Sequence, residues 1–421
     1  MDERQVATQV VESLREGIPP QRGVELYSVG HEELIDGIKC RHLERIGEAG
    51  RIRFISGSWG AGKTHFFRLL REAAFQSGCL VSSVELNVNE AALNKFERVF
   101  DSIVRNIATP DYHRLGLATE AAPFGHVLQE SLTYVGTGNR SVVNEISHDH
   151  YSEACKKLMT DPGIDIDFKK IVGKYWETFL PEAPDPVIQE QTREEILQWF
   201  SGEGIVGSFR KRFGVNKVVG RQNAKLMLQS LANFVKLAGY KGLLILFDEA
   251  EKAYSVMRKS ALRDAHNNLL HLINNVERHP GLFLIYATTP DFYTDPKHGI
   301  VIYGALAGRV GKPEDREPNA LDVIWNLDAV KTDLGSYQVA GERIRSLYAT
   351  AYPEDKSALP REAEIRGFVE KLYQIHPELS AVRFWRVLVA AVVSHCDDKV
   401  QGRARSPQKL HDDVMDRLRE E

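Results

Sequence analysis

A glycine-rich loop at residues 57–64, GSWGAGKT, limits the fold of this chain more than any other feature. It matches the pattern G-x-x-x-x-G-K-[ST]. Arginine and apolar side chains alternate before it, at residues 51–56, as in a strand, and apolar residues recur at helical spacing after it, from Phe67 to Ala74. Since the pattern has its meaning only between a strand and a helix, the sequence predicts an α/β core in which this loop joins the two.

The loop predicts a site for the phosphates of a nucleotide. Its glycines allow backbone N–H groups to converge on phosphate oxygens at the positive end of a helix. We expect Lys63 to reach the β- and γ-phosphates and the Thr64 hydroxyl to bind Mg²⁺. The alternative is a chance match in a loop with a purely structural role. The residues predicted to hold the nucleotide are Gly57, Ser58, Trp59, Gly60, Ala61, Gly62, Lys63 and Thr64.

A second motif lies far downstream, where the apolar run 243–247 (LLILF) ends in Asp248 and Glu249. A continuous apolar run of this length is typical of a strand buried on both faces of a parallel sheet. At the carboxyl end of such a strand, Asp248 can hold Mg²⁺ through its water shell, and Glu249 can orient an attacking water. The alternative is an acidic cap on the helix that follows.

Another buried-strand pattern, 282–287 (LFLIYA), ends in Thr288, Thr289 and a proline. A hydroxyl at this strand end could contact the γ-phosphate or the attacking water, and the alternative is a turn that ends the strand before proline. Helical spacing over 260–278 predicts the crossover that two parallel strands need. In all, strands are expected near 51–56, 80–86, 243–247, 282–287 and 321–326.

Composition excludes several classes of protein. The chain has 421 residues, of which 43% are hydrophobic and 27% charged, as in a soluble globular protein. Its net charge of −4 gives no overall basic field, so any DNA contact must be local. The four cysteines are too scattered for a disulfide framework or a zinc site. With a charged N-terminus and no long apolar run, we expect a cytoplasmic protein without a membrane span.

The segment from about residue 110 to about residue 220 is too long for an unstructured loop inside a compact domain. Residues 152–162, 167–180 and 192–202 have helical patterns, which predicts a helical insertion. Near its end lie Arg210, Lys211 and Arg212, which could contact DNA phosphates without reading bases. The alternative is an ordinary solvated surface. From about residue 338 to the end, the chain again has helical patterns, including 379–393.

Three segments together resemble the ATP-binding protein family of BREX-type bacterial phage-defence clusters. They are the loop and helix GSWGAGKTHFFRLLREAA, the segment AGYKGLLILFDEAE at 238–251, and the strand end YATTPDFY. The upstream phrase LREGIPPQRGVELYSVGHEEL is similar as well, so the resemblance runs in pieces from about residue 13 to about residue 400. It implies an AAA+-type ATPase core related to origin-recognition and helicase-loader proteins, with a helical lid.

The resemblance also implies roles for individual residues. Val29 and Gly30 occupy the place of the segment that lies against adenine. Arg309, in YGALAGRV, is the expected arginine finger from a neighbouring subunit, and Arg383 is the expected lid arginine, with Arg386 as its competitor. The threonines at 288 and 289 depart from the asparagine common in origin-recognition relatives, which leaves their role as sensors open.

The sequence therefore predicts an α/β protein with a P-loop AAA+-type parallel sheet core, a helical insertion and a C-terminal helical lid. The expected layout is an N-terminal helical, adenine-side segment at 1–50, the ATPase core at 51–330 with its insertion, and the lid at 331–421. The expected function is that of a Mg²⁺-dependent ATPase, acting as a nucleotide-driven switch or loader in anti-phage defence.

The predicted cofactors are ATP and Mg²⁺. The predicted partners are other proteins of the defence system, a helicase among the candidates, DNA at the local basic residues, and further copies of the chain in a nucleotide-dependent oligomer. Two alternatives stay open: a nucleotide-sensing scaffold with little turnover, and a P-loop phosphotransferase. The phosphotransferase would need an acceptor pocket, and a glutamate beside the metal aspartate suits water better.

Overall fold

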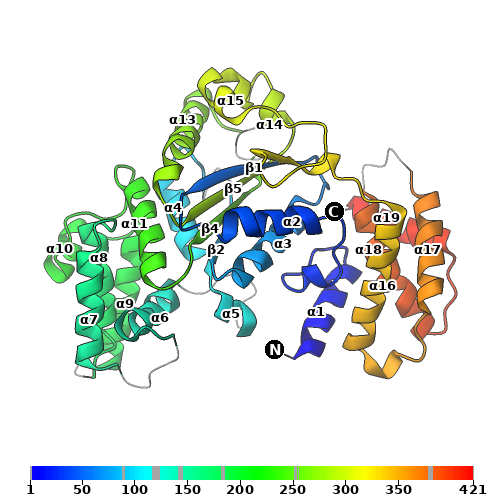
Figure 1. The fold of residues 1–421 in the computed structure, drawn as a ribbon, viewed down its shortest axis with the longest axis horizontal. Helices are drawn as coiled ribbons and strands as arrows, with labels where there is room; N and C mark the ends of the chain where they lie inside the picture. The colour runs from blue at the N-terminus through cyan, green and yellow to red at the C-terminus, as the bar shows by residue number, and fades with distance from the viewer. Residues whose placement is uncertain are drawn as a thin grey trace. The chain divides into compact units, whose positions relative to one another are not determined.

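A computed structural model describes residues 2–87, 91–115, 124–140, 146–181, 185–250, 254, 256–377 and 383–420 (Figure 1). The chain divides into two compact units. We call residues 38–55 and 74–313 the sheet unit. Residues 1–37, 56–73 and 314–421 contain the glycine-rich loop, and we call them the loop unit.

Among its described residues, the sheet unit contains five strands in the order β3-β2-β4-β5-β1. Strands β2, β4 and β5 are parallel, and the two-residue β3 pairs with β2 in the antiparallel sense. Their bounds are β1 (Arg51–Ser56), β2 (Leu80–Glu85), β3 (Ile107–Ala108), β4 (Leu243–Asp248) and β5 (Leu282–Thr288). The strands predicted near 51–56, 80–86, 243–247 and 282–287 are thus confirmed, and β3 was not predicted.

The carboxyl ends of three strands lie at one edge of this sheet. Phe247 of β4 is in register with Tyr286 of β5. On the other side of β5, the Tyr286 ring lies 5.8 Å from the ring of Phe54 in β1, and the Thr288 hydroxyl donates to the carbonyl of Ile55 at 2.9 Å. Strands β4, β5 and β1 therefore end side by side. In a parallel sheet this is the edge at which ligands bind.

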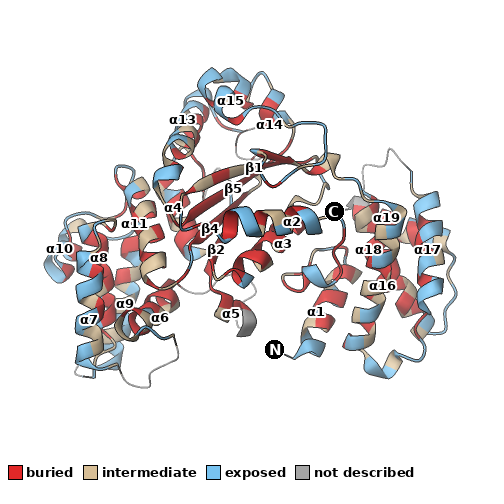
Figure 2. Cartoon of the chain, viewed as in Figure 1, coloured by how far each residue is buried: buried red, intermediate tan, exposed pale blue. Residues whose placement is uncertain are grey.

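The side chains of the strands in the sheet unit are largely buried (Figure 2). Helices connect these strands along the chain. The crossover predicted over 260–278 is present between β4 and β5, and it continues into the short turn η3 (Val276–Arg278). The helices of this part of the unit are α4 (Phe96–Arg105), α13 (Lys259–Asn275), α14 (Asp291–Thr294) and α15 (Gly304–Val310), with the short π-helix η2 (Lys39–Leu43) and the 3₁₀ turn η4 (Ile300–Ile302).

The described residues of the insertion between β3 and β4 form helices joined by loops, and they contain no strand. Its helices are α5 (Pro110–Leu115), α6 (Phe124–Thr137), α7 (His148–Thr160), α8 (Ile166–Glu177), α9 (Pro186–Phe200), α10 (Val206–Phe213) and α11 (Ala224–Leu237). They enclose their own aromatic core, in which Trp176, Phe200 and Phe234 are buried. The indole N–H of Trp176 donates to the carbonyl of Leu128 at 2.8 Å, so even its polar atom is satisfied.

The loop unit combines the two ends of the sequence. Its elements are α1 (Glu3–Arg15), η1 (Val24–Leu26), α2 (Glu32–Ile38), α3 (Lys63–Gln76), β6 (Ile324–Asn326), η5 (Leu327–Ala329), α16 (Leu334–Ala351), η6 (Pro353–Asp355), α17 (Glu362–Ile375), α18 (Phe384–Val400) and α19 (Pro407–Glu420); α2 and α3 end at the border of the unit. The predicted helix 379–393 is present from Phe384 onward, and residues 379–382 lie outside the described part. β6 is shorter than the predicted strand 321–326.

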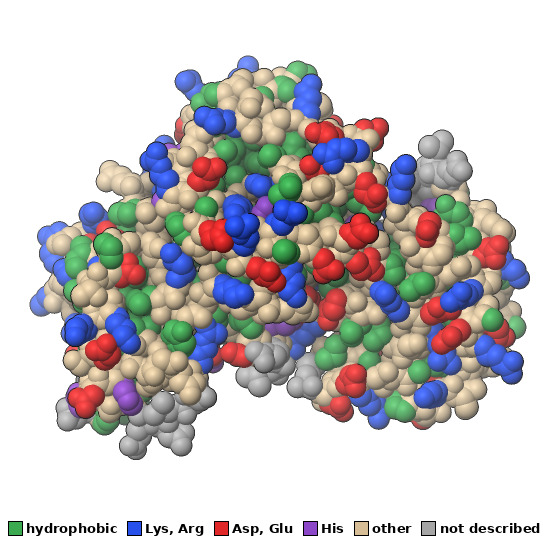
Figure 3. Space-filling view, viewed as in Figure 1, with side chains coloured by type: hydrophobic (Ala, Val, Ile, Leu, Met, Phe, Trp, Pro, Cys, Tyr) green, Lys and Arg blue, Asp and Glu red, His purple; other side chains and the backbone are tan. Residues whose placement is uncertain are grey.

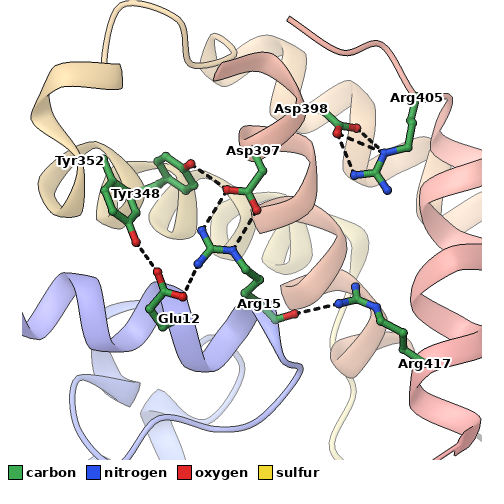
Figure 4. A network of polar contacts seen from close by, with 8 residues as sticks. All are labelled: Glu12, Arg15, Tyr348, Tyr352, Asp397, Asp398, Arg405 and Arg417. Atoms are coloured by element: carbon green, nitrogen blue, oxygen red, sulfur yellow. Dashed lines mark hydrogen bonds and ion pairs between the residues drawn. The ribbon is translucent and has the colours of Figure 1, made fainter. Parts of the chain in front are cut away.

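Helix α1 shares one apolar core with α16–α19, to which Val10, Ile344 and Val392 contribute. A polar network borders that core (Figure 4). The Arg15 guanidinium donates to both oxygens of Asp397 at 3.0 Å, and the Tyr348 hydroxyl donates to the same carboxylate at 2.8 Å. No helix among the described residues is long and apolar enough to cross a membrane.

Candidate functional site

The glycine-rich loop lies between the end of β1 and the first turn of α3, as the motif requires. Gly60 and Gly62 have φ values of +76° and +89°, a conformation that favours glycine. The carbonyl of Gly62 accepts the N–H of Phe66 at 2.8 Å, which starts the helix. The loop therefore turns tightly onto a helix N-terminus, whose N–H groups and dipole attract phosphate.

Lys63 folds back over this loop. Its ammonium group donates to the carbonyl of Gly57 at 2.8 Å and lies 5.6 Å from the centre of the Trp59 ring. Trp59 itself is 62% exposed, and Thr64 is exposed at the start of α3. The cation thus lies at the loop, close to where phosphates would bind.

A cavity of about 580 Å³ opens onto the loop, within the loop unit. Gly60, Ala61 and Gly62 line it, together with Val29 of the N-terminal segment and residues of α16, α17 and α18. Cavities of this size hold drug-sized ligands. Gly30 does not line it; this glycine has a φ of +83° and lines an adjoining cavity of about 600 Å³.

Arg383, the residue directly before α18, lines the same cavity, while Arg386 is not among the lining residues. The guanidinium of Arg383 donates to Asp328 Oδ1 at 2.7 Å. The other oxygen of Asp328 accepts the backbone N–H of Ser58 at 2.8 Å and the Ser58 hydroxyl at 2.7 Å. One carboxylate therefore joins Arg383 to the glycine-rich loop.

Aromatic side chains form a second link, between α18 and residues close to the loop. The ring of Tyr27 stacks on Trp385 of α18 at 6.1 Å, and Trp385 meets His65 of α3 edge-on at 5.6 Å. His65 Nε2 also shares a hydrogen bond with the Ser28 hydroxyl. Burial lowers the pKa of His65 to about 3, so its imidazole is neutral at physiological pH.

Sequence reasoning missed Asp328, Tyr27, His65 and Trp385. Asp328 belongs to no motif, and its role depends on β6 and η5, which present it to the loop. The other three side chains each lie within two positions of a predicted site residue. That proximity is the one signal that could have found them.

The acidic pair lies at the end of β4, in the sheet unit, and both side chains are partly buried. Glu249 has a φ of +55° and is the one non-glycine residue with positive φ among the described residues. Its N–H donates to Asp248 Oδ1 at 2.9 Å. A glutamate in this conformation is strained, and such strain is characteristic of functional sites.

Thr288 and Thr289 end β5 next to that pair in strand order. The Thr288 hydroxyl is fully buried, donates to the Ile55 carbonyl and shares a 2.9 Å hydrogen bond with the Tyr293 hydroxyl. These contacts favour the alternative reading of a strand-ending turn for Thr288. The backbone carbonyl of Thr289 accepts the N–H of Phe292, which leads into α14.

The remaining predicted residues lie on surfaces of the sheet unit. Arg309 is exposed near the end of α15. Arg210, Lys211 and Arg212 are exposed on α10, at an edge of the insertion where Figure 3 shows several basic side chains. Arg212 forms an ion pair with Glu195 of α9, so its charge is partly neutralised.

A metal ion would have few protein ligands here. Among the described residues, no group of three or more His, Cys, Asp or Glu side chains could hold one. The predicted donors, the Thr64 hydroxyl and the Asp248 carboxylate, nevertheless fit Mg²⁺, because this ion binds through one or two protein oxygens together with substrate phosphates and water.

Comparison with known proteins gives one match. No curated protein and no solved structure matches the chain. A family model described as BREX system ATP-binding protein BrxC/D matches residues 3–407, a range that contains every site residue described above. The chain therefore belongs to the family of BREX system ATP-binding proteins BrxC/D.

Proposed function

We propose that the protein binds ATP in the cavity of the loop unit and hydrolyses it with the help of Mg²⁺. One observation carries the binding step: a glycine-rich loop with two left-handed glycines lines a cavity of about 580 Å³ that Val29 and the lid arginine Arg383 also line. That arrangement offers N–H groups for phosphates at one place and apolar side chains for a base at another.

Each predicted residue then has a task. Lys63 would leave the Gly57 carbonyl and bind the β- and γ-phosphates. Thr64 and Asp248 would hold Mg²⁺, which neutralises phosphate charge when bound. Glu249 would orient the attacking water and take up its proton. Val29, with Gly30 beside it, would lie on the adenine side.

The strand order supports a shared task for the loop and the acidic pair. β1 runs directly into the loop, and β4 ends in Asp248, with β5 alone between these strands. Neighbouring strands are about 4.8 Å apart, so the carboxyl ends of β1 and β4 are separated by roughly 10 Å.

Two substitutions test this proposal. Glu249→Gln should keep ATP binding and abolish phosphate release, because the amide cannot accept the proton of the water. Lys63→Ala should lose ATP binding itself. Equilibrium dialysis with labelled ATP and a phosphate-release assay measure the two properties separately. Wild-type turnover in Glu249→Gln would remove that residue from the chemistry.

A nucleotide-sensing scaffold with little turnover is the second candidate. It is favoured by the resting contacts of the charged groups: Lys63 on the Gly57 carbonyl, Arg383 on Asp328, and Asp248 on the N–H of Glu249. All three would have to rearrange before hydrolysis. Tight ATP binding with negligible phosphate release, even with DNA and other defence proteins present, would identify this alternative.

The wider assignments are proposals as well. We infer that the protein works with other proteins of its defence system, that Arg309 completes a neighbour's site in a nucleotide-dependent oligomer, and that α10 contacts DNA phosphates. Mixing Arg309→Ala with Lys63→Ala subunits should restore some activity if sites are shared between copies. Thr288 and Thr289 stay proposed as sensors of the γ-phosphate or the attacking water, although the buried contacts of Thr288 favour a strand-ending turn. The three-part domain layout remains a prediction.

A further inference from the structure

We propose that Asp328 sets the ratio of the affinities for ATP and ADP, because it competes with the γ-phosphate of ATP for the guanidinium of Arg383. This inference rests on the proposed nucleotide site in the loop unit, and it gives a role to a residue outside every motif. Asp328 is a positioning residue: it acts through Arg383 and the glycine-rich loop.

Asp328 is held firmly where it lies. It belongs to the short helix η5, directly after β6, and its N–H donates to the Asn326 side chain at 3.2 Å. Its side chain is 23% exposed, against 47% for Arg383. Of the two partners, Asp328 is thus the less exposed, and Arg383, with its longer side chain, is the one able to move.

Both carboxylate oxygens of Asp328 have partners. Oδ2 accepts the N–H and the hydroxyl of Ser58, at 2.8 and 2.7 Å. Oδ1 accepts Arg383 Nη2 at 2.7 Å. The bonds to Ser58 fix the start of the glycine-rich loop, and the bond to Arg383 neutralises the lid arginine. These two effects can be separated by substitution.

Arg383 lies where its guanidinium can bind either the Asp328 carboxylate or a phosphate at the glycine-rich loop. A Cβ at Gly60 would lie 3.6 Å from Arg383 Cγ, so the stem of the arginine passes over the loop. Phosphate accepts an arginine in the same two-bonded manner as carboxylate does. A γ-phosphate at the loop would therefore take Arg383 from Asp328. ADP has no γ-phosphate, so it leaves the pair intact.

The ion pair between Asp328 and Arg383 thus weakens the binding of ATP and leaves the binding of ADP unchanged. Asp328→Asn removes the negative charge while leaving a side-chain oxygen for Ser58. We expect this variant to bind a non-hydrolysable ATP analogue roughly three- to fivefold more tightly, the range set by a partly exposed ion pair. ADP affinity should change by less than about twofold. Titration calorimetry with Mg²⁺ present measures both dissociation constants.

A double-mutant cycle makes the test specific. In an Arg383→Ala background, Asp328→Asn should no longer favour the ATP analogue, because no arginine remains to be released. A gain that persists in this background, or equal changes for the analogue and ADP, would overturn the proposal. Asp328→Ala provides a second variant: it loses the Ser58 bonds and some overall affinity, yet it should show the same shift in the ratio of the two constants.

The matched control is Asp322→Asn. Asp322 pairs with Arg316 at the same distance, 2.7 Å, in the same unit, and neither residue lines the cavity. Its substitution should leave both constants unchanged. If wild-type protein binds neither nucleotide, the proposed function fails. If it binds both and Asp328→Asn leaves their ratio unchanged, this inference alone fails.

Discussion

At the scale of single residues, Glu249 combines a strained backbone with a proposed catalytic role. Its left-handed backbone costs free energy that a glycine would not, and the bond from its N–H to Asp248 helps to hold that conformation. Nothing in the sequence LLILFDE predicts this strain, because propensities describe which residues favour a strand and not how its last residue turns.

Glu249→Gly should therefore stabilise the protein while it abolishes turnover. Relief of the strain should raise the free energy of unfolding by about 1 kcal/mol. Urea denaturation of Glu249→Gly, with Glu249→Gln as the control that keeps the strain, measures the difference. Equal stability of the two variants would mean that the backbone at this residue is not strained.

His65 makes stability depend on pH. Burial lowers its pKa to about 3, whereas an unfolded histidine titrates near 6.5. Below about pH 6.5 the unfolded state binds a proton that the folded state does not, so stability is complete above that pH and falls as the pH decreases toward 3.

His65→Gln should reduce the slope of the free energy of unfolding against pH between about pH 6 and 4. The reduction is up to about 1.4 kcal/mol per pH unit, which corresponds to one bound proton. Other histidines also have pKa values that burial lowers to about 4, among them His266 and His395, so part of the pH dependence will remain. Urea denaturation at a series of pH values provides the measurement, and His148→Gln, at an exposed position, is the control. A slope unchanged by His65→Gln would contradict the assignment.

At the scale of elements, α1 is attached to the C-terminal helices by the network in Figure 4. Asp397 accepts from both Arg15 and Tyr348. Arg15 also donates to Glu12 in α1, and this second bond lowers the pKa of Glu12. The amphipathic pattern of α1 could be read from the sequence, but its partner could not, since the packing depends on residues at the other end of the chain.

Asp397→Ala should destabilise the loop unit by about 1–3 kcal/mol, because two donors lose a charged acceptor. Glu354→Ala is the matched control, because it breaks the exposed ion pair between Arg4 of α1 and Glu354 of η6. This substitution should lower the free energy of unfolding by less than about 1 kcal/mol. Thermal unfolding compares the two. Equal losses of stability in the two variants would show that the Arg15–Asp397 contact contributes no more than an exposed ion pair.

The basic helix α10 is the other element with a testable role. If Arg210 and Lys211 contact DNA phosphates, their joint replacement by alanine should reduce the salt slope of DNA binding by about 2. Arg212→Ala should have less effect because Glu195 pairs with it. Fluorescence anisotropy across a salt series, with the exposed Arg45→Ala as control, measures the slope. An unchanged slope would leave α10 as an ordinary solvated helix.

At the scale of the whole molecule, the elements that could be predicted from the sequence are those whose patterns lie within one contiguous segment. The glycine-rich loop, the apolar strands β4 and β5 and the helices α7–α9 were found because their patterns are contiguous. Long-range placements were not found. Asp328 serves the loop only through β6 and η5, Trp385 only through the packing of α18, and β3 is too short for its period to be seen.

The central claim is that the loop and the acidic pair serve one magnesium-bound nucleotide. Its most direct test is the rate of phosphate release from ATP as a function of Mg²⁺ concentration, in wild type and in Asp248→Asn. We predict Mg²⁺-dependent hydrolysis in wild type and, in the variant, a magnesium requirement that is about 10- to 100-fold higher or a rate lowered by a similar factor. Wild-type hydrolysis with the same Mg²⁺ dependence in Asp248→Asn would contradict the claim.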